Sequence, residues 1–472
     1  MQSQSASLDF PVNVPGPTRE ASGVTSAWDP DDDLNQPPAP APREKRWDLA
    51  FFGIMLYVLV EYSRLPAMYP VLAVLNLGKV ALVSALLGLL FSSKPTTTVR
   101  SGIGHIDGIY VWLLVACFAS ALMAEFAGLA FGGALEAVMW VIIYVLISRI
   151  VNTPWRLRTV VFLFLLLNLK LGQFVVRGYS QGSAGASDQM VFIANGVGGG
   201  STGFFANSAD LGVAMCVAWP IAVALLFSRP KFFTKGLVWG CTFACLGAIL
   251  LCGSRGAVVG AAGIALGAWL KAPKKIIALF LIILLVAGIY LVLPEASKKR
   301  FESAKTPESD KTAKHRIELW KAGLRIFADH PVLGIGIHNY RWVRFYDYWI
   351  PILNDLATVP HNSFITGISE LGLLGFLPFI MLWISFFRLN SSTRKILIRA
   401  GPEARRSYEY CFSVGLDMGM IGYLASGTFV SVLWYPHIFV LTGLAAATHQ
   451  IVLAEQAKAS SQPEETPVRQ VA

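Results

Sequence analysis

Long apolar runs alternate with short polar segments along most of the chain. Each run is near the roughly 20 residues with which a helix crosses the hydrocarbon core of a bilayer. The pattern therefore predicts an all-α, polytopic integral membrane protein with about twelve transmembrane helices. The apolar runs cover about residues 49–63, 70–91, 106–124, 129–148, 159–176, 210–228, 234–252, 256–270, 276–293, 361–387, 410–430 and 434–454.

The segments outside these runs divide the chain into two tails, a membrane domain and one large loop. Residues 1–46 are polar and rich in proline, and residues 456–472 contain Gln, Glu, Ser and Pro. Such compositions leave little apolar surface to bury, so both segments are predicted to be disordered cytoplasmic tails. Residues 47–455 form the predicted membrane domain, and its 294–360 segment is the long loop.

Apolar residues within this loop recur at spacings of three and four between Lys314 and Asp329. The period predicts an amphipathic helix on the membrane surface, which Pro331 ends. Arg316 lies on the same side of this helix as Trp320, one turn away, and periodicity alone leaves open whether it is a surface charge or a ligand-binding group. The apolar positions are Ile317, Trp320, Leu324 and Phe327.

Lysine and arginine mark one side of the predicted membrane domain. Short loops rich in these residues stay in the cytoplasm, and every second loop between the apolar runs is basic. Both termini are therefore predicted to be cytoplasmic, and the 294–360 loop periplasmic. The basic residues are Arg43, Lys45, Arg46, Lys94, Arg100, Arg149, Arg156, Arg158, Arg229, Lys231, Lys235, Lys271, Lys274, Lys275, Arg388, Arg394, Lys395, Arg399, Arg405 and Arg406.

Composition narrows the function classes. Hydrophobic residues make up 54% of the 472 residues and charged residues only 14%, against roughly one quarter charged in soluble domains, and mean hydropathy is +0.55. A lipid bilayer is therefore an expected partner. The net charge of +10 comes from the basic loops rather than from a groove with interleaved aromatics, so nucleic acid is not an expected partner.

The sequence offers no pattern typical of a metal or cofactor site. The six cysteines lie within or at the ends of apolar runs, without zinc or disulfide spacing. The acidic run Asp29-Pro30-Asp31-Asp32-Asp33 lies in the N-terminal tail, where a solvated cluster is the favoured interpretation over a metal site. We expect neither a metal nor a cofactor.

Two segments on the predicted periplasmic side combine glycine with arginine. The Gly-rich stretch 196–205 follows Arg177 but lacks the lysine and the strand-to-helix context of a phosphate-binding loop, so a flexible loop is favoured and Arg177 is a weaker anion-binding candidate. In Gly253-Ser254-Arg255-Gly256, a guanidinium stands between glycines at the membrane surface. Arg255 either anchors its helix there or binds a phosphate or pyrophosphate, and we favour the second role.

His361 and Asn362 open the tenth apolar run and form the most informative stretch of the chain. An imidazole titrates near neutral pH, so at a water-facing helix start it offers proton transfer. The alternative is a helix-capping residue, because Pro360 and Asn362 are typical of a helix start. In a regular helix Glu370 would lie on the face opposite His361 and would not bind it.

Two further features accompany this stretch. Gly372 and Gly375 are predicted to pack closely against a neighbouring helix. His437, at the outer end of the last apolar run, is a second imidazole on the same predicted side.

Together these motifs resemble the O-antigen ligase and O-antigen polymerase superfamily, which also includes bacterial protein O-oligosaccharyltransferases. His361-Asn362 followed by Gly372-Leu373-Leu374-Gly375 is similar to the family signature, and Gly253-Ser254-Arg255-Gly256 is similar to its Ser-Arg-Gly motif. The segments 316–320 and 331–336 resemble the sequence that leads into the large periplasmic loop. The resemblance is best over about residues 200–380.

The resemblance implies transfer of a glycan from undecaprenyl diphosphate to an acceptor hydroxyl at the periplasmic face of the bacterial inner membrane. The transfer would invert the anomeric centre without a metal, in lipopolysaccharide or other cell-surface polysaccharide biosynthesis. His361 would be the general base, and Arg255 and Arg316, with Arg177 as a third group, would bind the diphosphate. Asn362 and His437 would have supporting positions.

The resemblance leaves the acceptor open. A ligase transfers to lipid A core, a polymerase to another lipid-linked glycan, and an oligosaccharyltransferase to Ser or Thr of a protein; we favour the ligase. A membrane transporter is the alternative from another class, but its expected inverted repeats are not evident. A non-catalytic assembly protein would leave His361 without a role. The ionisable groups that could line a transport pathway are Lys79, Glu136, Lys170 and Asp417.

Overall fold

The computed structural model describes most of the predicted membrane domain. Within the described residues every regular element is a helix, which confirms the all-α prediction. Residues 1–45, 462–472 and the Gly-rich stretch 196–205 lie outside the described residues. The described ranges are 46–63, 69–91, 103–180, 208–229, 232–292, 311–346 and 359–461.

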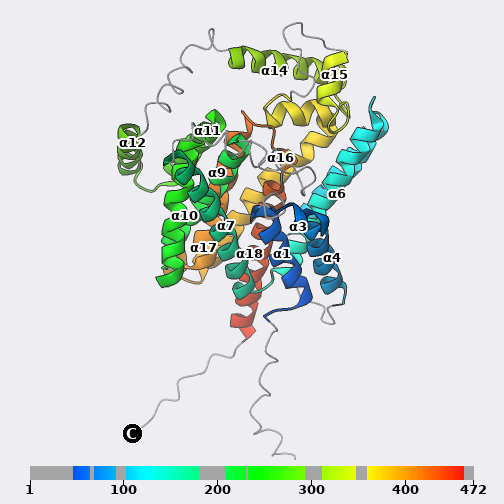
Figure 1. The fold of residues 1–472 in the computed structure, drawn as a ribbon. Helices are drawn as coiled ribbons and strands as arrows, with labels where there is room; N and C mark the ends of the chain where they lie inside the picture. The colour runs from blue at the N-terminus through cyan, green and yellow to red at the C-terminus, as the bar shows by residue number, and fades with distance from the viewer. Residues whose placement is uncertain are drawn as a thin grey trace, which may run out of the picture. The chain divides into compact units, whose positions relative to one another are not determined.

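Each of the twelve apolar runs coincides with helical structure (Figure 1). Eleven runs form one helix each, and the run 70–91 forms two. The last helix continues to Ser461, six residues into the segment expected as a disordered tail. These helices are α1 (Leu49–Ser63), α3 (Pro70–Val74), α4 (Leu77–Leu90), α5 (Gly104–Leu122), α6 (Ala127–Ile150), α7 (Pro154–Ser180), α9 (Ser208–Leu226), α10 (Phe232–Leu251), α11 (Arg255–Lys271), α12 (Lys275–Val292), α16 (Ser363–Arg399), α17 (Tyr408–Gly427) and α18 (Pro436–Ser461).

Seven of the described helices are long and apolar enough to cross a membrane, fewer than the twelve expected. These seven are α5, α6, α7, α9, α10, α16 and α18. A span of about 20 residues is needed to cross the hydrocarbon, and α1 and α4 have only 15 and 14 residues. The chain is thus built as a multi-pass membrane protein with several additional, shorter apolar helices.

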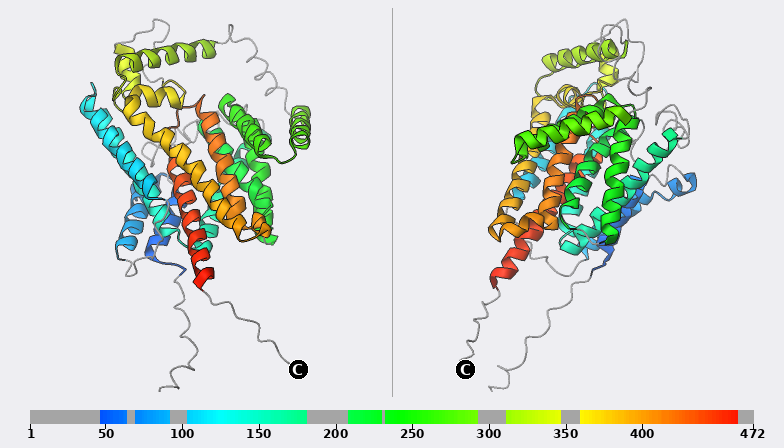
Figure 2. Two further views of the ribbon diagram at one scale, coloured as in Figure 1. Left: turned by 180° about the vertical axis from the view of Figure 1, so that it is seen from behind. Right: turned by 90° about the vertical axis from the view of Figure 1, so that its left-hand side faces the viewer.

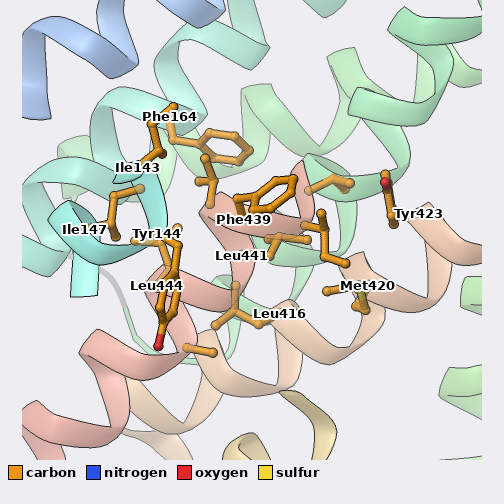
Figure 3. Close-up of a cluster of buried hydrophobic side chains, with 14 of the residues drawn as sticks. Ile143, Tyr144, Ile147, Phe164, Leu416, Met420, Tyr423, Phe439, Leu441 and Leu444 are labelled. Atoms are coloured by element: carbon orange, nitrogen blue, oxygen red, sulfur yellow. The ribbon is translucent and has the colours of Figure 1, made fainter. Parts of the chain in front are cut away.

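One part of the buried core lies among α6, α7, α17 and α18 (Figure 3). Aromatic and aliphatic side chains from all four helices interdigitate there, with Phe439 of α18 near the centre. Close approach of the helix backbones requires small residues: a Cβ atom added at Gly419 of α17 would lie 3.0 Å from the carbonyl oxygen of Val217 in α9. Packing of this kind drives helix association where lipid is as apolar as the side chains.

The helix α12 shows the opposite pattern of burial. Its large side chains are exposed, among them Ile276 at 85% and Phe280 at 63%. Within the described residues it packs mainly against α11. Such an apolar surface is unfavourable in water and is typical of a helix that contacts lipid.

Two helices between α12 and α16 lie at the end of the bundle where α16 begins (Figure 2). They are α14 (Lys311–Asp329), which ends two residues before Pro331 as predicted, and α15 (Tyr340–Tyr346). Ile317 and Leu324, two of the positions expected to face the membrane surface, are 44% and 50% exposed. A second set of apolar side chains packs α14 against the protein in a small core, formed by Leu319, Ala322, Ile326, Ile335, Tyr340 and Val343.

Candidate active site

The backbone around His361 is fixed on both sides. His361 has a φ of 51°, in the left-handed region that few residues other than glycine occupy. The carbonyl oxygen of Pro360 accepts a hydrogen bond of 2.8 Å from Nε1 of Trp320 in α14. The backbone N–H of Asn362 donates to Oγ of Ser431 at 3.2 Å. An unfavourable conformation persists only where the surroundings determine it, and such residues cluster at functional sites.

Asn362 supports His361 by starting the helix that follows. Its side-chain oxygen accepts hydrogen bonds from the backbone N–H groups of Phe364 and Ile365, at 2.9 and 3.1 Å, so Asn362 is the N-cap of α16. His361 therefore stands just outside the helix, and the capping role considered as the alternative for His361 belongs to Asn362. The next residue, Ser363, donates to the carbonyl oxygen of Val430 at 2.7 Å.

The electrostatic surroundings keep the His361 imidazole neutral. Burial lowers its pKa from the usual 6.5 to about 4, and the positive charges of Arg316 and His315 contribute to this shift. A cation close to an imidazole disfavours the protonated ring. The structure thus brings two of the predicted site residues, His361 and Arg316, into electrostatic contact.

Arg255 joins the same region through the loop 428–435, which connects α17 to α18. Ser254 caps α11, since its side chain accepts from the N–H of Ala257 at 3.4 Å, and Arg255 is the first residue of that helix. A Cβ atom added at the next residue, Gly256, would lie 2.9 Å from the side chain of Val430. Arg255 and His361 therefore flank one loop.

The loop 428–435 also contacts α14. The rings of Phe429 and Trp320 lie 6.1 Å apart between centroids. The three segments that carried the sequence prediction, around Arg255, Arg316 and His361, thus meet at this loop.

The remaining predicted residues lie further out or deeper. Arg177 is exposed in the last turn of α7. The neighbouring Val176 would meet a Cβ atom added at Gly247, so this end of α7 lies near the end of α10 that precedes Arg255. His437 is 1% exposed in the first turn of α18. The centroid of its ring lies 6.2 Å from that of Tyr62 and 6.0 Å from that of Tyr423, so the ring is packed inside the bundle rather than at a water-facing surface.

The glycine-rich end of the His361 signature breaks α16. Gly372 has a φ of 59°, and a Cβ atom there would lie 2.4 Å from the backbone carbon of Val332. The segment 331–336 runs alongside the break and forms four backbone hydrogen bonds with it. The bonds join Ile335 N–H to Ser369 O, Gly336 N–H to Glu370 O, Leu373 N–H to Pro331 O and Leu374 N–H to Val332 O, at 2.8–3.1 Å.

This contact corrects one expectation. The close neighbour of Gly372 is the 331–336 loop and not another helix, while a Cβ atom at Gly375 would meet Leu371 of its own helix. The positive φ at Gly372 interrupts the helix only after Glu370, so it leaves the expected separation of Glu370 from His361 unchanged. Glu370, just before the break, receives the N–H of Tyr340 at 3.4 Å.

A cavity of 380 Å³ lies beside the start of α16 and contains groups that sequence reasoning did not place in the site. In it, Nε2 of His338 lies 3.0 Å from a carboxylate oxygen of Glu136. This carboxylate raises the pKa of His338. The cavity is lined by Glu136, Trp140, His338, Arg341, Val359, Thr366, Glu370, Ser431, Leu433, Trp434, Tyr435 and Pro436.

The four ionisable groups considered for a transport pathway do not gather in the structure. Lys79 and Lys170 are exposed, and Glu136 lines the cavity just described. Asp417 is buried at the other end of α11 and α16, where it pairs with Lys271 at 2.6 Å and Arg394 at 2.8 Å. Among the described residues, no three His, Cys, Asp or Glu side chains form a group that could hold a metal ion.

Comparison with known proteins agrees with the motifs. The family model described as O-antigen ligase matches residues 240–380, within the 200–380 range over which the resemblance is best. The matched range contains Arg255, Arg316 and His361, whereas Arg177 and His437 lie outside it. No curated protein matches the chain. Residues 240–380 are therefore similar to the O-antigen ligase family, in agreement with the resemblance that the motifs carry.

Proposed function

We propose that the protein transfers a glycan from undecaprenyl diphosphate to the hydroxyl of an acceptor at the periplasmic face of the bacterial inner membrane. The observation that carries this proposal is the neutral imidazole of His361, held beside Arg316 and across one loop from Arg255, within the residues that are similar to the O-antigen ligase family. A neutral imidazole accepts a proton, and guanidinium groups bind a diphosphate through several fixed donors.

In the proposed step the acceptor hydroxyl attacks the anomeric carbon and gives its proton to His361. The new bond between carbon and acceptor oxygen forms as the bond to the diphosphate oxygen breaks, so the configuration inverts and the lipid diphosphate leaves with the electron pair. Arg255 and Arg316 neutralise the charge that develops on the leaving group. Arg177 is a third candidate for this role.

Binding of the donor would also strengthen the base. The charge of Arg316 lowers the pKa of His361 in the protein without substrate. A diphosphate bound to Arg316 would offset that charge, so the pKa of His361 would rise toward its usual value once the donor is in place. A stronger base is then present only when there is a glycan to transfer.

A reconstituted assay tests the proposal and identifies the acceptor. Purified protein in liposomes receives an undecaprenyl-diphosphate glycan alone, then with lipid A core, then with a Ser/Thr-rich peptide. We favour a single transfer that requires lipid A core, which identifies a ligase. A ladder of lengthening lipid-linked product from the donor alone identifies a polymerase, and transfer to the peptide an oligosaccharyltransferase. Transfer to none of the three, together with ion flux in the same liposomes, would favour the transporter instead.

The orientation is tested separately. The basic loops predict that both termini are cytoplasmic and that His361 and Arg255 are periplasmic. Reporter fusions after residue 350 and after residue 400 should give periplasmic and cytoplasmic signals, respectively. A cytoplasmic signal from the first fusion would contradict the proposed site.

A further inference from the structure

The cavity beside α16 contains buried polar atoms without a partner. Oε2 of Glu370, Nε1 of Trp140 and Nε1 of Trp434 have no hydrogen-bond partner among the described residues. The three side chains are 4%, 2% and 8% exposed, and all three line the same 380 Å³ cavity. Buried polar groups are nearly always hydrogen-bonded, so three such groups around one cavity point to a ligand with both donors and acceptors.

The chemistry of the three groups restricts that ligand. An indole N–H only donates and a carboxylate oxygen only accepts, whereas a hydroxyl group does both. A polyhydroxylated ring therefore satisfies all three groups at once. The volume lies within the roughly 300–1,000 Å³ typical of pockets for small ligands, and Trp140 and Trp434 add broad apolar faces of the kind that cover the C–H face of a sugar.

The charges around the cavity distinguish it from the diphosphate site. Glu136 and Glu370 are carboxyl groups, Arg341 is a cation, and His338 is held by Glu136. The carboxyl groups are thus accompanied by groups of opposite charge, Arg341 and the paired His338, so the cavity has no excess of cations for a diphosphate and suits a neutral saccharide. The cations proposed for the diphosphate, Arg255 and Arg316, are not among the lining residues.

The cavity is continuous with the backbone that holds the proposed base. Val359 lines it two residues before His361. Thr366 lines it from the first turn of α16 and donates a hydrogen bond of 2.9 Å to the carbonyl oxygen of Asn362. Ser431, which fixes the N–H of Asn362, is a third lining residue. The cavity therefore adjoins the segment that carries His361, although His361 itself is not among the lining residues.

We propose that this cavity binds a neutral sugar ring of the transfer reaction, with Glu370, Trp140 and Trp434 as its hydrogen-bonding groups and the Glu136–His338 pair as a wall. The proposal rests on the proposed function for the identity of its ligand. Its binding chemistry, however, requires neither the lipid diphosphate nor a working base, so it is testable without transfer.

The test measures binding of free saccharides to the full chain in lipid nanodiscs, by saturation-transfer difference NMR. Two probes are used: the glycan released by mild acid from the undecaprenyl-diphosphate donors of the native host cells, and the core oligosaccharide released from lipopolysaccharide of the same cells. Binding of the first assigns the cavity to the donor glycan, and binding of the second alone assigns it to the acceptor. Absence of binding by both probes would overturn the proposal.

Conservative variants connect that binding to the cavity. Glu370→Gln replaces an acceptor oxygen by a donor NH2 group and Trp434→Phe removes a donor, so each should weaken binding about 10-fold. Trp383→Phe is the matched control, because Nε1 of Trp383 is also buried without a partner among the described residues but the side chain does not line the cavity. It should bind within about twofold of the unmodified protein. Equal binding by the two cavity variants and the control would refute the assignment.

His361→Ala separates this proposal from the proposed function. This variant should bind the free saccharide normally while its transfer rate falls by about 10²–10⁴-fold. If the unmodified protein binds the saccharide but transfers no glycan, the cavity assignment stands and the proposed transferase activity is wrong. If Glu370→Gln and Trp434→Phe transfer with normal rates and affinities, the transferase stands and the cavity assignment is wrong.

Discussion

Nε1 of Trp320 donates a hydrogen bond of 2.8 Å to the carbonyl oxygen of Pro360. This bond connects α14, which lies beyond the bundle, to the residue immediately before His361. It holds one side of a backbone segment that has a positive φ, and the bond from Asn362 to Ser431 holds the other. The position of the imidazole therefore depends on a helix 40 residues earlier in the chain.

Removing that bond should impair transfer more than stability. Trp320→Phe keeps most of the ring packing against Phe429 but loses the donor, and a displaced imidazole lowers the rate by about 10- to 100-fold. Initial transfer rates in liposomes measure the effect. Trp269→Phe is the matched control, since Nε1 of Trp269 also donates to a backbone carbonyl, that of Lys275, at 3.1 Å. Equal rates in the two variants would show that the Trp320 bond does not position the base.

The break in α16 predicts a strong effect of a single methyl group. In Gly372→Ala, the new Cβ would meet the backbone of Val332 and the residue would be strained at a φ of 59°. Strain of this kind costs about 1–3 kcal/mol, so the thermal midpoint in detergent should fall by several degrees. Gly288→Ala in α12, where nothing lies within 4 Å of an added Cβ, should leave the midpoint unchanged or raise it. An unchanged midpoint in Gly372→Ala would contradict the packing described.

The lowered pKa of His361 predicts an unusual acid limit for activity. A general base stops working when it is protonated, and here protonation requires a pH near 4 rather than 6.5. The pH dependence of kcat/KM reports the protein without substrate. The pH at which kcat/KM falls on the acid side should therefore lie well below 6. Arg316→Gln removes a positive charge that disfavours the imidazolium, so this pH should move upward, toward 6.5. Arg325→Gln, on the exposed side of the same helix, should not move it. A fall of kcat/KM near pH 6.5 in the unmodified protein would contradict this electrostatic account.

The proposed role of Arg255 depends on the shape of its side chain as well as its charge. Lysine supplies a point charge without the planar fork, so Arg255→Lys should lower the transfer rate by about 10-fold or more. Arg399→Lys, exposed at the far end of α16, should have no effect. We also expect that a chelator leaves the rate unchanged. Loss of activity with chelator, restored by a divalent ion, would replace the arginine-based account with a metal-based one.

Much of the fold could be predicted because each helix is specified locally. The apolar runs define where helices form, since a run near 20 residues satisfies its own backbone hydrogen bonds in the membrane. The face by which α14 packs could not be read in the same way. Of its equally apolar residues, Ile317 and Leu324 are exposed, whereas Leu319, Ala322 and Ile326 are buried against Tyr340 and Val343, a contact that exists only in the folded chain.

The site was predictable only in part for a related reason. Arg255, Arg316 and His361 stand in recognisable local motifs, and the structure brings their segments to one loop. The cavity beside them is built from residues far apart in the chain: Glu136 and His338 are separated by 202 positions and pair only in the folded protein. The sequence shows His338 two residues after Gly336, but nothing in the sequence connects His338 to Glu136 of α6.

The most direct test of the account is the transfer rate of His361→Ala in liposomes with the lipid-linked donor and the acceptor that the unmodified protein uses. Loss of a general base lowers the rate by about 10²–10⁴-fold, and the protein should remain in the membrane at normal abundance. His105→Ala, an exposed histidine at the start of α5, should transfer at the unmodified rate. A His361→Ala rate equal to that of His105→Ala would show that His361 is not the base.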